Sequence, residues 1–291
     1  MELITPNGTA QLIRHLVHER TGMLYADDKN SLLLEKLSPL VIERGFESSL
    51  DYYYLLKYDQ DAEKEWRSVV DAISVQETYF WREMDQIRAM VDLLISEWLK
   101  NGNERPLKVW SAACATGEEP LSIAMALTEA GWYKRIPIEI DATDVSDAAL
   151  AKAKEGLYRE RSFRNLPRPL REKYFTQEEH GWRINPEIHS RVKWHKANLV
   201  NRVEIAPFAQ RPFIFCRNVF IYFSNEMIRR VVKTFADYAN VGAHLFVGVS
   251  ESLLQTTNDF ELIDVGDAFV YKLVRKRGLG SLSEQGSASA R

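Results

Sequence analysis

Cysteine is scarce in this sequence, with only Cys114 and Cys216 among 291 residues. Two cysteines are too few for a disulfide framework and fit a reducing compartment, and neither has an adjacent base, so we expect both to be small packing residues. No apolar run approaches the roughly 18 residues that a membrane span needs, and the first residues lack the basic flank and apolar core of a signal peptide. These absences predict a cytoplasmic protein without direct membrane insertion.

Charge of one sign is not in strong excess either. The chain has 38 Lys and Arg residues against 41 Asp and Glu residues, which argues against a nucleic-acid partner. Residues 152–202 nevertheless contain 13 basic and 6 acidic residues, which form either an ordinary solvated face or a surface that attracts an acidic partner. The six histidines are dispersed. Only His15 and His18 are close together, without a carboxylate or cysteine at ligand spacing, so we expect no metal site.

The chain divides into a helical part and a larger α/β part. Residues 1–73 have helical apolar spacing, and we expect a small N-terminal all-helical domain there. A further helix, with an apolar stripe from Ile87 to Trp98, should end at Asn101-Gly102-Asn103, which tolerates left-handed backbone. Residues 74–277 should form the larger domain. The small, polar residues 278–291 predict a disordered tail.

Strand and helix patterns alternate beyond residue 107. Apolar, β-prone runs predict strands at 108–112, 136–142, 213–216, 244–249 and 269–274. Helical spacing predicts helices at 120–130, 147–154 and 225–238. Because crossover connections place helices on the faces of a parallel sheet, we expect an α/β class with a doubly wound, mostly parallel sheet. Ligands of such sheets bind beyond the carboxyl ends of the strands.

The loop after the first strand reads SAACATGEEP, residues 111–120. Its small residues let the backbone approach a ligand, and the helix after it begins with unpaired N–H groups. Since Glu118 and Glu119 would repel a pyrophosphate, a nicotinamide dinucleotide is disfavoured. The sulfonium and ammonium of S-adenosylmethionine fit better. The alternative is a plain tight turn before a capped helix.

The second strand ends at Asp144. An acid at this place can accept two hydrogen bonds from a ribose diol. Asp144 could instead cap the next helix, but Ser146 already stands at that position, so the ribose contact is the favoured interpretation.

Five segments resemble the successive signatures of the chemotaxis-receptor methyltransferase (CheR) family. They are SVQETYFWRE (74–83), WSAACATGEEPLSIA (110–124), IDATDVSDAALAKAKEGLY (140–158), KANLV (196–200) and FCRNVFIYFSNE (215–226). They occur in the family's order, so a joint match by chance is not expected. The resemblance implies a Rossmann-like S-adenosylmethionine methyltransferase fold, with a small β-subdomain insert at about 173–197.

The resemblance also implies the functional residues. Three would be catalytic: Arg82 at the incoming carboxylate, Asn218 near the transferred methyl group and Tyr222 in the substrate slot. The residues implied for the cofactor and its product S-adenosylhomocysteine are Gln76, Thr78, Arg82, Ala113, Glu118, Asp144, Asn198, Leu199, Asn218 and Val219. Among these, Glu118 would contact the methionine ammonium. Asp144 would contact the ribose, and Asn198 with Leu199 the adenine.

The implied activity is methyl transfer to glutamate side chains on the cytoplasmic helical bundle of a methyl-accepting chemoreceptor, by a monomeric enzyme. A glutamate carboxylate has a reference pKa of about 4.3, so it is already the nucleophile and needs no general base. The alternatives are a carboxyl methyltransferase for a different signalling protein and a catalytically silent cofactor-binding scaffold. A nucleic-acid methyltransferase is disfavoured, because residues 217–220 read Arg-Asn-Val-Phe where an acidic-proline-aromatic motif would stand.

Three features depart from the family pattern. Gln76 stands where the family typically has asparagine. Residues 1–73 contain 8 basic and 13 acidic residues, whereas family members often carry a basic receptor-facing helix there. The resemblance therefore does not assign the surface that docks the receptor. Residues 176–183 predict a compact hairpin loop, which resembles the shorter insert of members that do not depend on a tethering pentapeptide.

Overall fold

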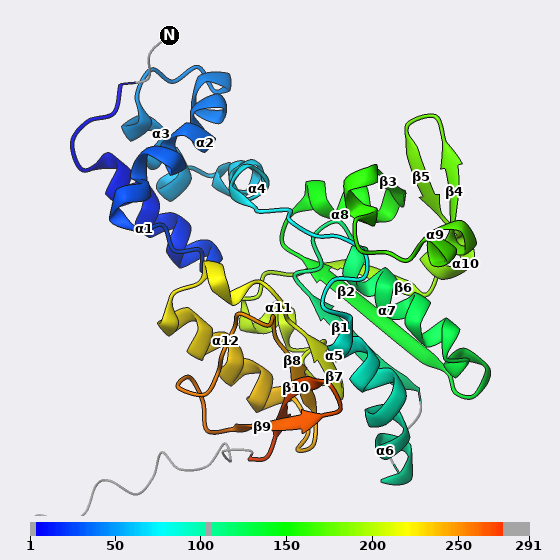
Figure 1. Ribbon diagram of the computed structural model, residues 1–291. Coiled ribbons are helices and arrows are strands. Elements are labelled where there is room, and N and C mark those ends of the chain that lie inside the picture. Colours follow the sequence, from blue (N-terminus) through cyan, green and yellow to red (C-terminus); the bar gives the residue numbers. More distant parts are fainter. Residues whose placement is uncertain (1–3, 103–105, 276–291) are drawn as a thin grey trace, which may run out of the picture.

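The computed structural model describes residues 4–102 and 106–275. Asn103, the last residue of the expected helix end, and the expected tail at 278–291 lie outside them. Near the N-terminus, helices form a group of their own (Figure 1). They pack around a separate core, which includes Ile13, Leu33 and Tyr52. These helices are α1 (Thr9–Thr21), α2 (Asn30–Glu43), α3 (Ser49–Tyr58) and α4 (Ala62–Ile73), with a 3-10 turn at Asp27–Lys29.

A longer helical stretch follows. It consists of α5 (Met84–Arg88), a π-helical turn (Ala89–Leu94) and α6 (Ile95–Lys100). The expected apolar stripe is buried at Ile87 and Leu94. The apolar spacing does not reveal the π turn, because a π turn changes the helical register over a few residues only.

The larger part is built on a seven-stranded sheet with the order β6-β2-β1-β7-β8-β10-β9. Strands β6, β2, β1, β7 and β8 run parallel, and β10 is antiparallel to both β8 and β9. The strands are β1 (Leu107–Ala112), β2 (Ile138–Asp144), β6 (Val192–Lys196), β7 (Phe213–Phe215), β8 (His244–Phe246), β9 (Phe260–Val265) and β10 (Ala268–Leu273). This confirms the expected mostly parallel α/β sheet.

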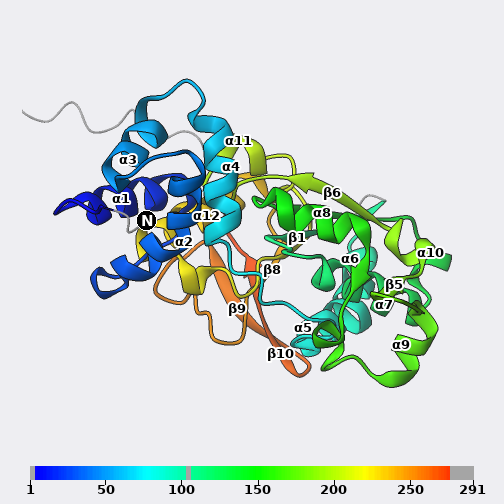
Figure 2. The ribbon, with the colours of Figure 1, turned by 90° about the horizontal axis from the view of Figure 1, so that it is seen from above.

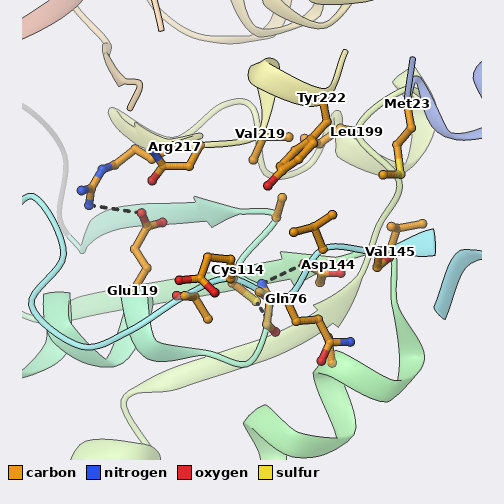
Figure 3. Close-up of a pocket in the computed structure, with 18 of the residues that line it drawn as sticks. Met23, Gln76, Cys114, Glu119, Asp144, Val145, Leu199, Arg217, Val219 and Tyr222 are labelled. Carbon is orange, nitrogen blue, oxygen red and sulfur yellow. Dashed lines mark hydrogen bonds and ion pairs between the residues drawn. The ribbon is translucent and has the colours of Figure 1, made fainter. Parts of the chain in front are cut away.

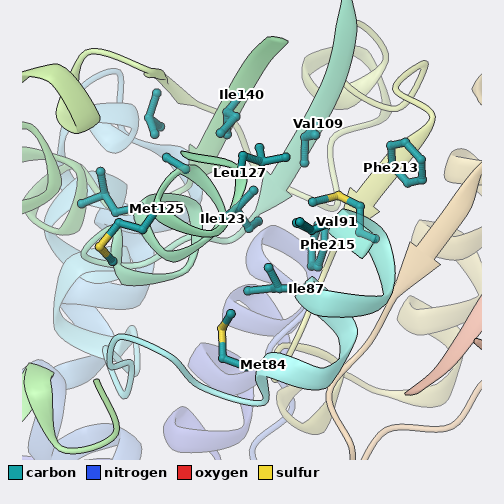
Figure 4. Close-up of a cluster of buried hydrophobic side chains, with 14 of the residues drawn as sticks. Met84, Ile87, Val91, Val109, Ile123, Met125, Leu127, Ile140, Phe213 and Phe215 are labelled. Carbon is teal, nitrogen blue, oxygen red and sulfur yellow. The ribbon is translucent and has the colours of Figure 1, made fainter. Parts of the chain in front are cut away.

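Helices cover both faces of this sheet. Val109 and Phe215 pack with Ile87 of α5 in one layer (Figure 4). Trp110 and Ile214, on the same two strands, pack in the opposite layer, which contains α12. The remaining helices are α7 (Glu118–Glu129), α8 (Asp147–Glu155), α9 (Arg168–Tyr174), α10 (Pro186–His189), α11 (Arg202–Ile205) and α12 (Asn225–Tyr238). None of the helices in the described ranges combines the length and the apolar content that a bilayer crossing requires.

A second, three-stranded sheet has the order β3-β5-β4. Strands β4 (Phe175–Glu178) and β5 (Gly181–Ile184) form a hairpin within the range expected for the insert. The third strand, β3 (Leu157–Tyr158), precedes that range, and β6 at its end belongs to the main sheet. Figure 2 shows this hairpin on the side of the molecule away from α1–α4.

Several element boundaries differ by one to three residues from the expected ones, and two of the differences bear on the site. Helix α7 begins at Glu118 rather than at residue 120, so both glutamates of the loop lie in its first turn. Strand β8 ends at Phe246 rather than at residue 249. Residues 247–251 therefore form a turn at the carboxyl end of the sheet, although Val247 and Val249 are β-prone.

Candidate functional site

A cavity lies at the carboxyl ends of β1, β2 and β7, and all of the predicted site residues except Glu118 line it. The predicted residues that line it are Gln76, Thr78, Arg82, Ala113, Asp144, Asn198, Leu199, Asn218, Val219 and Tyr222. Figure 3 shows Tyr222 and Leu199 on one side of the cavity, and Asp144 and Gln76 on the other. The fold thus brings together segments that are far apart in the sequence.

Asp144 is the last residue of β2, and main-chain donors fix its carboxylate. Its Oδ1 accepts from the N–H of Ser146 and its Oδ2 from the N–H of Ala115, both at 2.8 Å. Burial raises the pKa of the Asp144 carboxyl, and these hydrogen bonds oppose that rise. Ser146 caps α8 by accepting from the N–H of Ala149 at 3.0 Å. Since each carboxylate oxygen can accept more than one hydrogen bond, Asp144 retains capacity for a diol.

The loop after β1 has a strained backbone. Ala113 and Ala115 have positive φ angles of 54° and 47°, a conformation that costs about 1–3 kcal/mol for residues other than glycine. The N–H of Cys114 donates to the carbonyl of Thr143 at 2.9 Å, which ties the loop to β2. The cysteines Cys114 and Cys216 are buried free thiols, and burial raises the pKa of both well above the ordinary value. These properties suit packing residues and not nucleophiles.

The two adjacent glutamates of α7 face different surroundings. Glu118 is turned away from the cavity: its carboxylate accepts from the hydroxyls of Thr116 at 2.6 Å and Ser162 at 2.9 Å. Glu119 lines the cavity and accepts from the hydroxyl of Ser111 at 2.7 Å. Burial raises the pKa of both carboxyls. The geometry therefore favours Glu119 over Glu118 for contact with a cationic ligand.

Arg217 is a buried cation that joins three segments around the cavity. Only 2% of its side chain is exposed. Its guanidinium lies 3.3 Å from the carboxylate of Glu119 and 3.0 Å from that of Glu83, and it donates to the carbonyl of Arg82 at 2.8 Å. Burial alone would raise the pKa of the Glu83 carboxyl. The positive charge of Arg217 and the hydrogen bonds to Glu83 outweigh burial, so the pKa is lowered. Sequence reasoning missed Arg217 and Glu83 as site residues, although both lie inside the quoted signature segments.

The three predicted catalytic residues meet at one end of the cavity. Arg82 donates through Nη1 to the carbonyl of Glu77 at 2.9 Å, and its buried Nε has no hydrogen-bond partner. Asn218 has a positive φ of 58°, and its amide donates to Glu83 at 3.2 Å. Burial raises the pKa of Tyr222, so its phenol remains protonated at neutral pH and can donate a hydrogen bond.

The lining around Asp144 contains apolar side chains. Leu199, Val145 and Met23 lie there, above and beside Asp144 (Figure 3). The side-chain amide of Asn198 donates to the carbonyl of Arg20 at 2.8 Å and accepts from the N–H of Val200 at 3.2 Å. The main-chain N–H of Asn198 also donates within the protein, to the carboxylate of Glu204 at 2.8 Å, so these contacts fix the position of Asn198 in the lining.

The N-terminal helical domain supplies part of the cavity wall through Thr21 and Met23. The N–H of Leu24 donates to the carbonyl of Tyr222 at 2.8 Å, and Met23 forms an antiparallel bridge with Phe223. These contacts join segments about 200 residues apart in sequence, so no local pattern could have indicated them.

A second contact from the helical domain reaches the turn beyond Asp144. Asp71 of α4 accepts from the hydroxyl of Ser146 at 2.6 Å and from the N–H of Ala148 at 3.2 Å. The helical domain therefore supports both the substrate end and the Asp144 end of the cavity. Sequence reasoning missed Asp71 too, because it lies in an ordinary amphipathic helix.

The lining of the cavity fits S-adenosylmethionine. Carboxylates at Asp144 and Glu119 suit a ligand with a diol and positive charges, and the apolar side chains near Leu199 suit a flat base.

Within residues 4–102 and 106–275, no group of three or more His, Cys, Asp or Glu side chains could hold a metal ion.

Family models match both parts of the chain. The description CheR methyltransferase, SAM binding domain applies to residues 76–269, and CheR methyltransferase, all-alpha domain to residues 9–74. Both matches agree with the resemblance seen in the sequence.

Named relatives cover most of the chain. Chemotaxis protein methyltransferase 2 of Vibrio cholerae is 31% identical over 252 residues, which is 86% of this chain and 87% of that protein. Chemotaxis protein methyltransferase of Vibrio parahaemolyticus is 33% identical and covers 88% of this chain and 94% of its own. Probable biofilm formation methyltransferase WspC of Pseudomonas aeruginosa is 30% identical over 77% of this chain and 53% of its own. The chain therefore belongs to the CheR methyltransferase family and is an S-adenosylmethionine-dependent methyltransferase.

Proposed function

We propose that this chain methylates glutamate side chains on the cytoplasmic helical bundle of a methyl-accepting chemoreceptor. The observation that carries the proposal is Arg82, a cation that lines the cavity with 25% of its side chain exposed. Its buried Nε lies 3.8 Å from the carboxylate of Glu83, and its Nη1 donates to the carbonyl of Glu77. A guanidinium with five donors that is partly exposed at a cavity suits an incoming carboxylate. The names of the relatives from Vibrio cholerae and Vibrio parahaemolyticus support the assignment to chemotaxis.

The chemistry requires little from the protein besides orientation and exclusion of water. When bound, the cofactor supplies an electrophilic methyl group. The target carboxylate is ionised at neutral pH and attacks without a general base. Arg82 would hold one carboxylate oxygen while the other attacks, and entry into the cavity would remove water from the nucleophile. Tyr222, as a neutral phenol, would line the path of the side chain.

The cofactor contacts follow from the same geometry. Asp144 would accept hydrogen bonds from the ribose diol, and Glu119 would take the ammonium contact expected of Glu118. Leu199 and Met23 would pack on the adenine. Other lining residues that we propose for the cofactor are Gln76, Thr78, Ala113, Asn198, Asn218 and Val219. Of these, Gln76 accepts from the ammonium of Lys152 at 3.1 Å, which orients its amide.

We further propose that the enzyme acts as a monomer in the cytoplasm. The buried free state of Cys114 and Cys216 supports a reducing compartment. We also propose the division into domains 1–73 and 74–277, with the hairpin β4–β5 as the core of the insert. The helical domain makes hydrogen bonds to the catalytic part at both ends of the cavity, so the two would work as one unit.

The test is methylation of a panel of chemoreceptor cytoplasmic fragments with methyl-labelled cofactor, read by mass spectrometry. We expect base-labile label on glutamate side chains of at least one fragment, and loss of that label with Arg82→Ala. Label that resists base, or no label on any fragment, would contradict the proposal.

A second candidate substrate is a carboxylate on another signalling protein. It is favoured by the similarity to a relative whose name points to biofilm formation rather than chemotaxis. Adding whole receptor-like signalling proteins to the same panel separates the two candidates, because each predicts base-labile esters on a different set of targets. A silent scaffold would give no ester on either set.

A further inference from the structure

The turn after β8 contains a carboxylate that plays no part in cofactor binding as described above. Glu251 lies at the end of this turn, and its side chain points back toward the segment after β7. Its Oε2 accepts from the N–H of Asn218 at 2.8 Å and from the N–H of Gly248 at 2.6 Å, and its Oε1 from the N–H of Ile221 at 3.2 Å. One side chain therefore satisfies main-chain donors of two loops, and two of those donors flank the substrate end of the cavity.

These donors need a partner because neither loop is regular structure. A main-chain N–H that is withdrawn from water without a partner is costly. Glu251 supplies the acceptor within its own turn for Gly248, and the segment after β7 depends on the same carboxylate from outside itself. Asn218 adopts left-handed backbone with a φ of 58°, which no helix or strand around it enforces. A carboxylate is the acceptor best suited to several N–H groups at once.

The fit between the two loops is close. A Cβ atom at Gly248 would lie 2.4 Å from the amide nitrogen of Asn218 and 2.9 Å from Oε2 of Glu251. A side chain at residue 248 would therefore displace the amide of Asn218. Glycine at this position is what permits the turn to press against Asn218.

Two carboxylates hold Asn218, one at its main chain and one at its side chain. Glu251 binds its main-chain N–H, and Glu83 accepts from its side-chain amide at 3.2 Å. Glu83 uses one of the two N–H groups of this amide, so the second N–H and the amide oxygen of Asn218 remain for other contacts. Through the N–H of Ile221, Glu251 also restrains the short helix 220–222 that carries Tyr222.

We propose that Glu251 is a positioning residue for methyl transfer, which sets Asn218 and Tyr222 in their working orientation without touching cofactor or substrate. This inference rests on the proposed roles of Asn218 and Tyr222. A displacement of catalytic groups by about 1 Å can lower a rate about 100-fold. Loss of Glu251 should therefore act mainly on turnover. Cofactor affinity should change little, because most of the residues proposed for the cofactor, Asp144 and Glu119 among them, make no hydrogen bond with Glu251.

The test compares Glu251→Ala and Glu251→Gln in the full chain, with Glu261→Gln on exposed β9 as the matched control. We expect Glu251→Ala to lower kcat about 30-fold and to change the affinity for S-adenosylhomocysteine less than about threefold. Glu251→Gln should lose less, because its amide oxygen can still accept from Asn218 and Gly248. Glu261→Gln should match the unmodified enzyme.

A double-mutant cycle separates positioning from general destabilisation. In an Asn218→Ala background, Glu251→Ala should lower kcat by less than about threefold, because its effect passes largely through Asn218. An undiminished loss in that background, or a parallel fall in cofactor affinity and unfolding temperature, would overturn the inference.

A further readout does not depend on any assumed substrate. Glu251→Ala should accelerate amide hydrogen exchange in residues 216–224 and 247–251 while exchange in residues 107–146 stays unchanged. If exchange is unchanged everywhere, Glu251 does not hold these loops. If exchange changes as expected but no receptor fragment is methylated by the unmodified enzyme, the proposed substrate fails and the role of Glu251 in holding the loops stands.

Discussion

The two sides of the cavity are fixed by different means. On the cofactor side, Asp144 is bound to main-chain N–H groups of Ala115 and Ser146, which lie within one strand-loop-helix repeat of it. On the substrate side, Asn218 is held by the side chains of Glu83, just before α5, and Glu251, in the turn after β8. The direct hydrogen bonds to Asp144 thus come from within one repeat of the sheet. The substrate side is a product of tertiary packing and should be easier to change without losing the cofactor.

The largest expected effect concerns the cofactor side. Asp144→Ala removes the acceptor for the ribose diol and also frees two main-chain donors. We expect the affinity for S-adenosylhomocysteine to fall at least about 100-fold, since hydrogen bonds to a charged group contribute about 1.5–3 kcal/mol each. Isothermal titration measures this, with the unfolding temperature as a control for folding. An affinity like that of the unmodified enzyme would remove Asp144 from the site.

Arg82→Ala tests the substrate side. We expect kcat to fall about 50-fold, because the donor that orients the attacking carboxylate is lost. The affinity for S-adenosylhomocysteine should change less than about threefold, since other residues hold the cofactor. Arg82→Lys, which keeps the charge but not the fork, should recover part of the rate. If cofactor affinity falls as far as kcat, the two sides are not separable in the way described.

The adjacent glutamates of α7 offer a sharper comparison. Glu119→Gln should weaken binding of S-adenosylhomocysteine about tenfold, through loss of one charge pairing of about 1.4 kcal/mol. Glu118→Gln should leave it within about twofold, because an amide can still bond the hydroxyls of Thr116 and Ser162. Titration of both variants decides between the residues. The reverse order would restore Glu118 as the ammonium contact.

Asp71→Ala examines how far the helical domain supports the cofactor side. Loss of its hydrogen bonds to Ser146 and Ala148 should weaken binding of S-adenosylhomocysteine about fivefold, as expected for about 1 kcal/mol. The matched control is Asp61→Ala. Asp61 lies in the same domain, before α4, and its side chain makes no capping hydrogen bond to that helix. Equal affinities for both variants would mean that the turn after Asp144 keeps its position without the hydrogen bonds to Asp71.

The smallest effect is expected from salt. Nine of the 13 basic residues in 152–202 form ion pairs with acidic residues of the same chain. Little of the cationic excess therefore remains to attract a receptor. Raising the salt concentration from about 50 to about 300 mM should raise the KM for a receptor fragment only about twofold. No change at all would assign this surface to ordinary solvation.

Regular elements near the site could be predicted well from the sequence, and the site only in part. Helix 225–238 and the cap at Ser146 follow from local spacing and capping chemistry. The choice between Glu118 and Glu119 could not be predicted, because it depends on where α7 begins, and adjacent helical residues face directions about 100° apart. The roles of Asp71 and Glu251 could not be predicted either, for another reason. Their partners are distant in sequence, and neither stands in a motif with a known mechanism.

The bridge between Met23 and Phe223 has a consequence for how such enzymes could be recombined. A chimera that takes its first 73 residues from a relative would inherit new neighbours for the main chain of residues 222–224. The main-chain N–H of Leu24 anchors the carbonyl of Tyr222, and any residue except proline supplies that donor, so the new contacts would differ mainly in the side chains around Met23 and Phe223. Grafting the segment 217–224 together with the foreign helices should therefore succeed where the helices alone fail. Substrate specificity would then be transferred by exchanging two segments together and not by exchanging one domain.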